Sequence, residues 1–544
     1  MAMHFNLADM IEAVADRVPD REALVCGNRR ATYAQLDERA TQLAHFLQSR
    51  GVQAGNNVGL YMYNCVEYLE AMLACFKLRA VPINVNYRYV DDELRYIFDN
   101  ADLVACVLNR QFVPHLAVIA DSVSDLKACI AVEDGSEPAS ASSPEIVEFE
   151  QALQGQPAQR DFAERSEDDL FILYTGGTTG LPKGVIWSHK ALLFAAMGGG
   201  GHFSPLGPCE KASDIVSRIA EQPVTGIALA PLMHGASWWY ACIQLLAGNK
   251  LVLNHHHSLN GEQVWDICER EKINALQIVG DAMAIPLLDA LEANPGRWDL
   301  STIFGMSSGG AVFSQIKQDG FRAHFPGIRI INSFGSSESG QMGADSGSRK
   351  PEGGLGNVTR SAFMDVILEE DGTHRKARAG ERGIFARSGH IPEGYYGDPE
   401  KTARTFIVVE GKRWLLTGDE ARLEGDDTIT VFGRGSNCIN SGGEKVFPEE
   451  VEDALKAHAS IFDALVVGTP DPRWGNRVLA VVQLREGREL SLDAIQTHCR
   501  KHIAGYKIPR ALVLVDKIPR SPSGKPDYKT ASRIAHEQSE SCSA

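Results

Sequence analysis

Apolar runs alternate with helical patterns along most of the first 340 residues. The runs lie at 56–62, 103–108, 170–174, 226–230, 250–253, 274–279, 301–306 and 328–334. Helical patterns near 239–247 and 261–272 separate some of them. Strands that alternate with helices predict an α/β fold with parallel sheet, in which ligands bind at the carboxyl ends of strands.

Two N-terminal stretches give further predictions. Residues 7–50 are predicted to form helices that flank a short strand. Residues 134–165 are rich in Ser, Ala, Glu and Pro, which predicts an exposed connection.

A different pattern begins near residues 433–443, where four glycines interrupt regular structure. A helix is predicted from Pro448, with Pro in its first turn and acids where the helix dipole favours them. Strands at 464–467, 477–482 and 511–515 and a helix that opens at Ser491 follow. We therefore expect a large N-terminal domain of α/β subdomains over 1–433, and a smaller, mobile α+β domain over 434–544.

Composition narrows the function classes. The net charge of −16 argues against nucleic acid as the main partner, because a phosphate backbone needs a basic face. No apolar run approaches the ~20 residues of a membrane helix, and the first residues lack the features of a signal peptide. We expect a cytoplasmic protein with reduced cysteines.

The segment Tyr174-Thr-Gly-Gly-Thr-Thr-Gly-Leu-Pro-Lys-Gly184 is dense in glycine, threonine and charge, without apolar periodicity. We predict a loop rather than an ordinary helix or strand. Successive backbone N–H groups in such a loop form a concave site for an anion, typically a phosphate. Pro182 and Gly184 flank Lys183, so the segment is not the Gly-Lys-Ser/Thr phosphate loop. A flexible surface loop is the alternative.

Five further polar or glycine-rich segments interrupt the pattern. They are Pro231-Leu-Met-His-Gly235, Ser307-Ser-Gly-Gly-Ala311, Asn332-Ser-Phe-Gly-Ser-Ser-Glu338, Trp414-Leu-Leu-Thr-Gly-Asp419 and Pro519-Arg-Ser-Pro-Ser-Gly-Lys525. Together with the loop at 174–184, their order and spacing resemble the adenylate-forming superfamily of acyl-CoA synthetases, firefly luciferases and peptide-synthetase adenylation domains. The resemblance covers nearly the whole chain.

The resemblance implies a two-step reaction. A carboxylate attacks the α-phosphorus of ATP to give an acyl-adenylate and pyrophosphate, and the thiol of CoA then displaces AMP. The implied cofactors are ATP, Mg²⁺ and coenzyme A, the partners are a small-molecule carboxylic acid, ATP and CoA, and a homodimer is one possible assembly. Catalysis of this kind consists mostly of positioning and charge neutralisation around phosphates.

The nucleotide-binding roles come from the resemblance. The loop that grips the β- and γ-phosphates would be Thr175, Gly176, Gly177, Thr178, Thr179, Gly180 and Lys183. The adenine-binding turn would be Gly309, Gly310 and Ala311, followed by Ser333, Phe334, Gly335, Ser336 and Ser337. Phe334 replaces the usual tyrosine, so its ring can stack on adenine but offers no hydroxyl.

The resemblance also assigns the charged groups. Glu338 would hold Mg²⁺, with Thr178 as a second ligand, since this cation prefers oxygen. Asp419 would bind the ribose hydroxyls and Arg434 the ribose and phosphate. Lys525, on the smaller domain, would bridge the carboxylate and the α-phosphate. A solvated loop acid is the alternative for Glu338, and a surface lysine for Lys525.

The residues that would bind the acyl group and the CoA thiol are indicated less clearly by the sequence. His234 resembles the residue that gates the acyl tunnel, with a packed histidine as the alternative. Ser441, Gly442, Gly443 and Glu444 resemble the segment that lines the CoA tunnel. The hinge between the domains is expected near the uncharged Ser436, which departs from the usual charged pivot.

The segment from Gly433 to Val446 resembles one bacterial subgroup that acts on long-chain fatty acids or carboxylated steroid side chains. The substrate is therefore expected to be a medium- or long-chain fatty acid or a steroid side-chain carboxylate. The predicted wall of the acyl pocket, with core packing as the alternative, is Trp238, Trp239, Val279, Met283, Met306 and Gly340.

Three alternative functions stay open from the sequence. They are an adenylating enzyme that loads a separate carrier protein, a luciferase-like oxygenase, and a non-catalytic nucleotide-binding protein. Few residues follow Lys525, so no fused carrier domain is expected.

Overall fold

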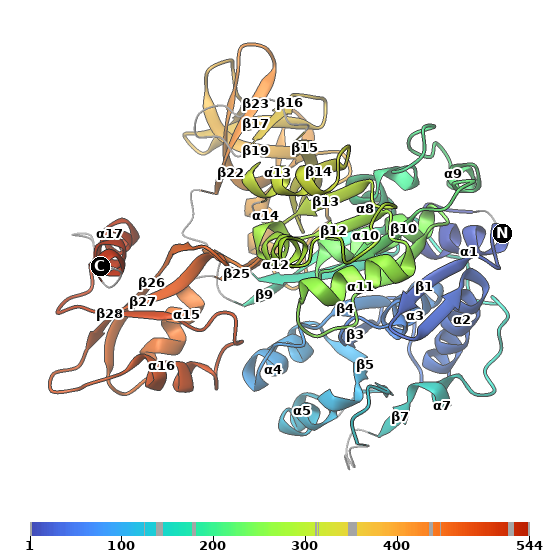
Figure 1. Ribbon diagram of the computed structural model, residues 1–544, viewed down its shortest axis with the longest axis horizontal. Coiled ribbons are helices and arrows are strands. Elements are labelled where there is room, and N and C mark those ends of the chain that lie inside the picture. The colour runs from blue at the N-terminus through green and yellow to red at the C-terminus, as the bar shows by residue number, and fades with distance from the viewer. Residues whose placement is uncertain are drawn as a thin grey trace.

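The computed structural model describes residues 3–123, 126–137, 145–176, 181–310, 313, 315–345, 356–434, 439–446, 448–519 and 527–541. A large α/β domain and a smaller C-terminal domain lie side by side (Figure 1), which confirms the predicted fold class. Within these ranges no helix is both long and apolar enough to span a bilayer.

The first eight-stranded sheet is mostly parallel and follows the order β20-β9-β8-β4-β3-β5-β6-β7. Its strands are β3 (Asn57–Tyr61), β4 (Val81–Asn84), β5 (Leu103–Asn109), β6 (Ala128–Val132), β7 (Ile146–Glu148), β8 (Leu170–Gly176), β9 (Pro182–Ser188) and β20 (Gly394–Tyr395). The helices around it are α2 (Tyr33–Ser49), α3 (Val66–Leu78), α4 (Asp91–Asn100), α5 (Val113–Val118), α6 (Ala120–Val123), α7 (Phe149–Leu153) and α8 (His189–Ala196).

The second eight-stranded sheet follows the order β15-β14-β13-β12-β10-β11-β1-β2. Its strands are β1 (Glu22–Cys26), β2 (Arg29–Thr32), β10 (Thr225–Ala228), β11 (Lys250–Leu253), β12 (Ala275–Ile278), β13 (Gly305–Gly309), β14 (Arg329–Ser336) and β15 (Gly340–Asp345). The helices near it are α1 (Leu7–Arg17), α9 (Ile215–Arg218), α10 (Gly235–Leu246), α11 (Gly261–Glu271), α12 (Gly280–Ala293) and α13 (Gln315–His324).

The two large sheets share one core. Phe171 and Leu173 of β8, and Leu251 and Leu253 of β11, point into a cluster that also contains residues of α2, α3, α8 and α10. The alternate residues of the same strands face outward, against α4 on one side and α11 to α13 on the other. Both faces of each sheet are therefore covered, which explains the continuous apolar runs.

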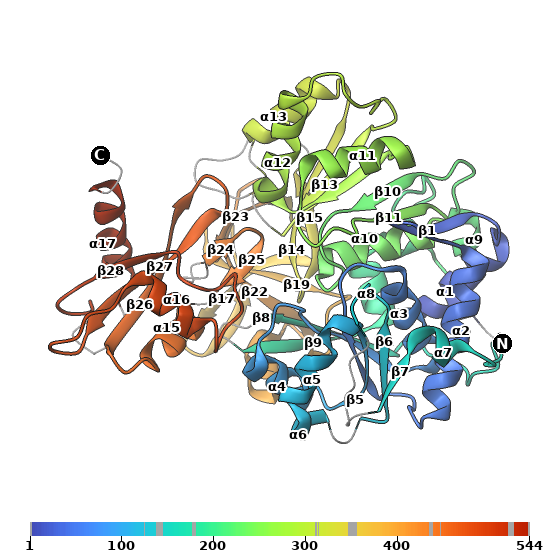
Figure 2. The same ribbon diagram turned by 60° about the horizontal axis from the view of Figure 1, so that its bottom comes forward.

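Two smaller sheets complete the molecule (Figure 2). The third sheet contains β16 (Gly356–Thr359), β17 (Met364–Glu370), β18 (Thr373–Lys376), β19 (Arg382–Ser388), β21 (Phe406–Val409), β22 (Lys412–Leu423) and β23 (Thr428–Arg434). The C-terminal sheet contains β24 (Ile439–Ser441), β25 (Glu444–Val446), β26 (Ile461–Asp471), β27 (Gly475–Leu484) and β28 (Ala511–Leu514). The remaining helices are α14 (Pro399–Thr405), α15 (Pro448–Lys456), α16 (Leu492–Cys499) and α17 (Tyr528–Ser541).

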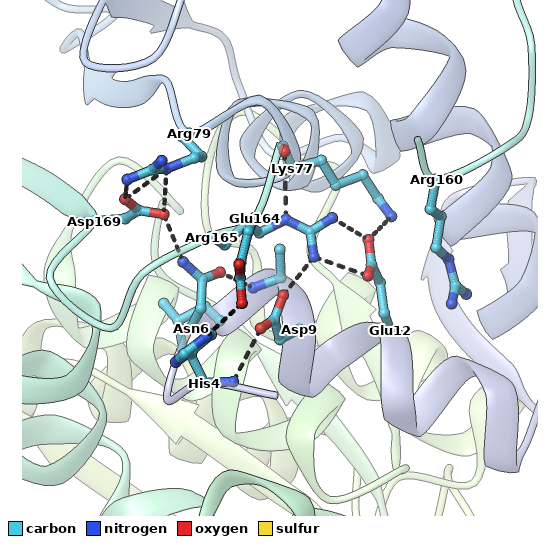
Figure 3. A network of polar contacts seen from close by, with 12 residues as sticks. His4, Asn6, Asp9, Glu12, Lys77, Arg79, Arg160, Glu164, Arg165 and Asp169 are labelled. Atoms are coloured by element: carbon cyan, nitrogen blue, oxygen red, sulfur yellow. Dashed lines mark hydrogen bonds and ion pairs between the residues drawn. The ribbon is translucent and has the colours of Figure 1, made fainter. Parts of the chain in front are cut away.

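A network of ion pairs joins α1, α3 and the segment before β8 (Figure 3), and Asp37 connects it to α2. Lys77 of α3 is only 1% exposed and donates to Glu12 and Asp37, at 2.5 and 2.6 Å. Arg165 donates to Asp9 and Glu12. Such a buried cation is tolerated only because several carboxylates surround it. The network fixes the chain where it enters β8, the strand that leads to the 174–184 segment.

The structure corrects four sequence predictions. Residues 7–50 contain two strands, β1 and β2, rather than one. The predicted exposed connection at 134–165 contains β7 and α7, and Phe149, Ala152 and Leu153 are buried. The strand predicted from Ser301 begins at Gly305. Strands also extend into the predicted loop at 174–184, because Thr175 and Gly176 belong to β8, and Pro182, Lys183 and Gly184 to β9.

Candidate active site

The 174–184 segment forms the end of the β8–β9 hairpin. Thr175 stands opposite Lys183 in the antiparallel register. The buried side chain of Asn84, at the end of β4, accepts from the Tyr174 N–H at 2.7 Å and donates to the carbonyls of Tyr174 and Met233, both at 2.9 Å. One amide group therefore fixes the start of this segment next to the loop that leads to His234.

Lys183 forms an ion pair with Asp398. Asp398 is the N-cap of α14 and accepts from the backbone N–H of Lys401 at 2.9 Å. The hydrogen bond from Lys183 lowers the pKa of Asp398. The ammonium group thus has a fixed place beside the hairpin end, where it could meet a phosphate.

Glu338 lies in the turn between β14 and β15, and this turn is held from several sides. The buried indole of Trp187, on β9, donates to the carbonyl of Ser337 at 2.9 Å. Arg387 donates to the carbonyls of Ser339 and Gln341. Burial lowers the pKa of Arg387 to about 10. The Trp187 contact joins the Glu338 turn to the strand that carries Lys183.

The adenine side is built from neighbouring parallel strands. Gly309 of β13 and Ser333 of β14 are register partners, and the Ser333 hydroxyl donates to the carbonyl of Ser308 at 3.1 Å. A Cβ at Gly309 would lie 3.1 Å from the Ser333 hydroxyl oxygen. The half-buried Phe334 ring packs toward Phe385 of the third sheet, at 6.3 Å between centroids. The missing side chain at Gly309 leaves room for the Ser333 hydroxyl, and the adenine role of these residues stays a prediction.

The two candidate ribose residues are brought together by the third sheet. Asp419 of β22 and Arg434 of β23 stand opposite each other in the antiparallel register. The backbone N–H of Asp419 donates to the hydroxyl of Thr417 at 3.1 Å. The pairing agrees with a shared ligand for the two positions, although they were predicted from separate segments.

His234 and Glu444 meet across the two domains. His234 is the N-cap residue of α10, and its Nε2 lies 3.0 Å from Glu444 Oε1. Arg88, in the loop after β4, donates to the same oxygen. Burial would raise the pKa of Glu444, but the charges of His234, Arg88 and Lys507 together lower it to about 2. Glu444 is thus an ionised group of the smaller domain whose hydrogen-bonded partners, His234 and Arg88, belong to the larger one.

A tight hairpin delivers Glu444 to this place. Ser441 and Glu444 are register partners, and the two residues between them have positive φ, +60° at Gly442 and +86° at Gly443. Two consecutive residues with positive φ are typical of a two-residue hairpin turn, and glycine is favoured at such positions. A Cβ at Gly443 would lie 2.8 Å from the side chain of Val279. The absence of a side chain lets the hairpin approach the larger domain this closely.

A second contact joins the domains beside the hairpin. Lys507 of the smaller domain donates to Glu93 of α4 at 2.6 Å, and the side chains are only 4% and 5% exposed. The charge pair therefore lies inside the domain interface rather than on its rim.

Of the six predicted acyl-pocket residues, Gly340 packs against the backbone of Ala195 in α8, and Met283 accepts from the Val279 N–H through its sulfur at 3.3 Å. The other four fall into two groups. Trp238 stacks on Phe171, with centroids 4.1 Å apart, and Met306 lies in the core between the second sheet and α11 to α13. Core packing, the alternative kept for each, describes these two. Val279 lies against Gly443, and the indole N–H of Trp239 is buried without a hydrogen-bond partner in the described structure. These two remain candidates for the pocket wall.

Several predicted residues lie outside the described ranges, so their roles stay predictions. They are Gly177, Thr178, Thr179, Gly180, Ala311, Ser436 and Lys525.

The donor set at Glu338 fits Mg²⁺ bound together with nucleotide. This cation usually takes one or two carboxylates and completes its shell with phosphate oxygens and water. Glu338 supplies one carboxylate in a turn that Trp187 joins to β9, the strand that also carries Lys183. Over the described ranges, no three His, Cys, Asp or Glu side chains gather into a metal site made by protein alone.

The sequence did not indicate Asp398, Arg387 or Arg88, nor Tyr395, whose hydroxyl donates to Glu338 Oε1 at 3.1 Å. A usable signal existed for two of them, because Glu393-Gly-Tyr-Tyr-Gly-Asp-Pro399 breaks periodicity as the six chosen segments do. The arginines carry no such signal, since single arginines are common on surfaces.

The layered large domain, the third sheet and the docked C-terminal domain define an adenylate-forming fold. A solved structure with this fold is the amide bond synthetase McbA from Marinactinospora thermotolerans, with a TM-score of 0.77, 22% identity, and 96% of this chain and 98% of that chain covered.

The chain belongs to the AMP-binding enzyme family. Residues 11–396 match the family described as AMP-binding enzyme, and residues 450–525 match its C-terminal domain. The chain is 46% identical to a 3-oxocholest-4-en-26-oate–CoA ligase of Rhodococcus rhodochrous, over 97% of this chain and 96% of the relative. It is 43% identical to a medium/long-chain-fatty-acid–CoA/3-oxocholest-4-en-26-oate–CoA ligase of Mycolicibacterium smegmatis, with 98% and 97% covered.

Proposed function

We propose that this AMP-binding enzyme, an ATP-dependent acyl-CoA ligase, activates a medium- or long-chain fatty acid or a steroid side-chain carboxylate. The substrate class rests on relatives with 43–46% identity over nearly the whole chain. The contact between His234 and Glu444 is the structural observation that carries the proposal. It joins a candidate acyl-site residue to a candidate CoA-tunnel residue from the other domain.

In the first step the acid's carboxylate attacks the α-phosphorus of ATP, and pyrophosphate leaves. Lys183 and the N–H groups of the hairpin would hold the β- and γ-phosphates. Glu338 would hold Mg²⁺, which supplies positive charge to the phosphates when bound. Lys525 would stabilise the charge that develops between the carboxylate and the α-phosphate.

In the second step a thiol attacks the acyl carbon, and AMP leaves. The Ser441–Glu444 hairpin lies against Val279 and His234, so it can form one wall of the thiol's path. His234 Nε2 faces Glu444 of the smaller domain at 3.0 Å. A thiolate is nucleophilic enough for this attack without a dedicated base.

A panel of acids with ATP and CoA tests the proposal. Saturated acids of increasing length, 3-oxocholest-4-en-26-oate and aryl acids are compared, with pyrophosphate release and loss of free thiol followed together. With the long-chain or steroid acids, we expect pyrophosphate release and thiol loss in equal amounts. With aryl acids, we expect much less of both.

Two results would contradict it. Pyrophosphate release without thiol loss would indicate a separate carrier protein as the acceptor. Preference for aryl acids would overturn the substrate class but not the reaction.

A further inference from the structure

The segment Gly394–Thr402, which contains β20 and the first residues of α14, contacts both halves of the candidate phosphate site. Asp398 pairs with Lys183, and the hydroxyl of Tyr395 donates to Glu338 Oε1 at 3.1 Å. Neither family resemblance nor the six polar segments assigned a role to this stretch. One short piece of chain therefore contacts both Lys183 and Glu338, so its position affects both groups.

Tyr395 is itself held rigidly. It is 7% exposed, and it pairs with Val185 of β9 in the antiparallel register. Its backbone N–H donates to the hydroxyl of Thr402 at 2.9 Å. Its ring meets Phe406 edge-on, with centroids 6.1 Å apart. The place of the hydroxyl is therefore set by the same strand that carries Lys183.

The main chain around Glu338 is fixed by other groups. Trp187 holds the carbonyl of Ser337, and Arg387 holds the carbonyls of Ser339 and Gln341. What these contacts leave undetermined is the direction of the Glu338 carboxylate. The hydrogen bond from Tyr395 constrains that direction, because it ties one carboxylate oxygen to a rigid donor.

A phenol is suited to this task. Its neutral O–H donates to an ionised carboxylate without cancelling the negative charge that attracts a cation. A lysine or arginine at the same place would form an ion pair and compete with the metal. Partners of this kind orient metal-binding carboxylates, and their loss typically reduces metal affinity by about 10–100-fold.

We propose that Tyr395 is a positioning residue that orients Glu338 toward Mg²⁺ bound with ATP, and so acts on the adenylation step alone. The inference rests on the proposed function, because it takes Glu338 as the metal-binding carboxylate. Tyr395 touches neither nucleotide nor acid in this scheme.

Tyr395→Phe tests the proposal, since it removes the hydroxyl and keeps the ring. The matched control is Tyr396→Phe, whose hydroxyl donates instead to Asp102 at 2.8 Å. The full-length proteins are titrated with Mn²⁺ in the presence of ATP and without any acid, and bound Mn²⁺ is followed by electron paramagnetic resonance. We expect the dissociation constant of Mn²⁺ to rise about 10–100-fold in Tyr395→Phe and to stay unchanged in Tyr396→Phe.

Two further measurements complete the test. The Mg²⁺ concentration for half-maximal pyrophosphate release should rise by a similar factor, while conversion of preformed acyl-AMP to acyl-CoA should stay at the wild-type rate. Wild-type Mn²⁺ affinity in Tyr395→Phe, the same loss in Tyr396→Phe, or equal loss in both half-reactions would overturn the proposal. Because the Mn²⁺ titration needs no acid, its result can be interpreted even if the proposed substrate class is wrong.

Discussion

The two ends of the candidate site are held in different ways. At the Glu338 end, an indole, a phenol and one guanidinium fix a turn, and all of these groups belong to the larger domain. At the Glu444 end, a carboxylate of the smaller domain meets Arg88 and His234 of the larger one, and Lys507 meets Glu93. The first set involves one domain only, whereas every contact of the second set crosses the domain boundary.

The difference indicates which contacts can change during the reaction. If the smaller domain moves between the two steps, contacts within one domain need not break, so the proposed metal-binding end can stay preorganised. When charge pairs across the boundary separate, both partners enter water together. No charge is then left buried without a partner. We expect the Glu444 end to form and break in each cycle, while the Glu338 end stays as it is.

The largest expected effect separates the two half-reactions. Lys525→Ala should reduce adenylation by about 100–1,000-fold, the scale seen when one group that stabilises transition-state charge is lost. Thioester formation from preformed acyl-AMP should be spared. Single-turnover assays of each step measure the two rates, and equal losses would show that Lys525 does not act on adenylation alone.

Breaking the buried ion pair at the domain boundary should have the second-largest effect. Lys507→Met leaves Glu93 buried without its partner, and such a change costs about 3–5 kcal/mol of the docked arrangement. Adding Glu93→Leu should recover most of the loss, because no charge is then left alone. Small-angle X-ray scattering and thioester formation report on docking, and equal defects in the single and double variants would contradict the pairing.

Glu444→Gln should weaken the other boundary contact more mildly. The amide keeps the shape of the side chain but loses the charge that faces Arg88 and His234. We expect thioester formation to slow by about tenfold, which corresponds to a loss of ~1.4 kcal/mol, with adenylation unchanged. Exposed Glu489→Gln is the matched control. A slower adenylation step would mean that Glu444 serves both ends of the site.

The smallest expected effect concerns pH. The pKa of Glu444 is lowered to about 2, so its stabilising contribution is fully present above the ordinary value of 4.5 and is lost as the pH falls toward 2. Between pH 7 and about 5, Glu444 should therefore cause no change in docking. As the pH falls through this range, the difference between the scattering curves of wild type and Glu444→Gln should not become smaller, because Glu444 stays ionised. A difference that shrinks already between pH 7 and 6 would contradict the lowered pKa.

The sequence predicted the α/β fold, because strands buried on both faces are continuously apolar. The family resemblance assigned Gly309 and Ser333 to the adenine side and Asp419 and Arg434 to the ribose side, and the structure places each pair in register on neighbouring strands. Their roles toward a ligand stay predictions. The sequence could not predict the pair of Lys183 and Asp398, whose positions are 215 residues apart. Such a contact depends on how β20 joins the edge of the first sheet, and no local pattern encodes that.

The same limit explains the error at 174–184. Glycine and threonine have no apolar periodicity, yet Thr175 and Lys183 form cross-strand partners. Hydrogen bonds between neighbouring strands, rather than side-chain burial, hold the backbone there. Periodicity reports only burial, so it ended the predicted strand at 170–174 too early and predicted no strand at 182–188.

Gly443 has a consequence for energy use in the cell. Its missing side chain is what lets the hairpin lie against Val279, and at a φ of +86° any other residue would also be strained. A larger residue there would keep the smaller domain from closing over the mixed anhydride. Water would then compete with the thiol, and each turnover would consume ATP while returning the acid unchanged.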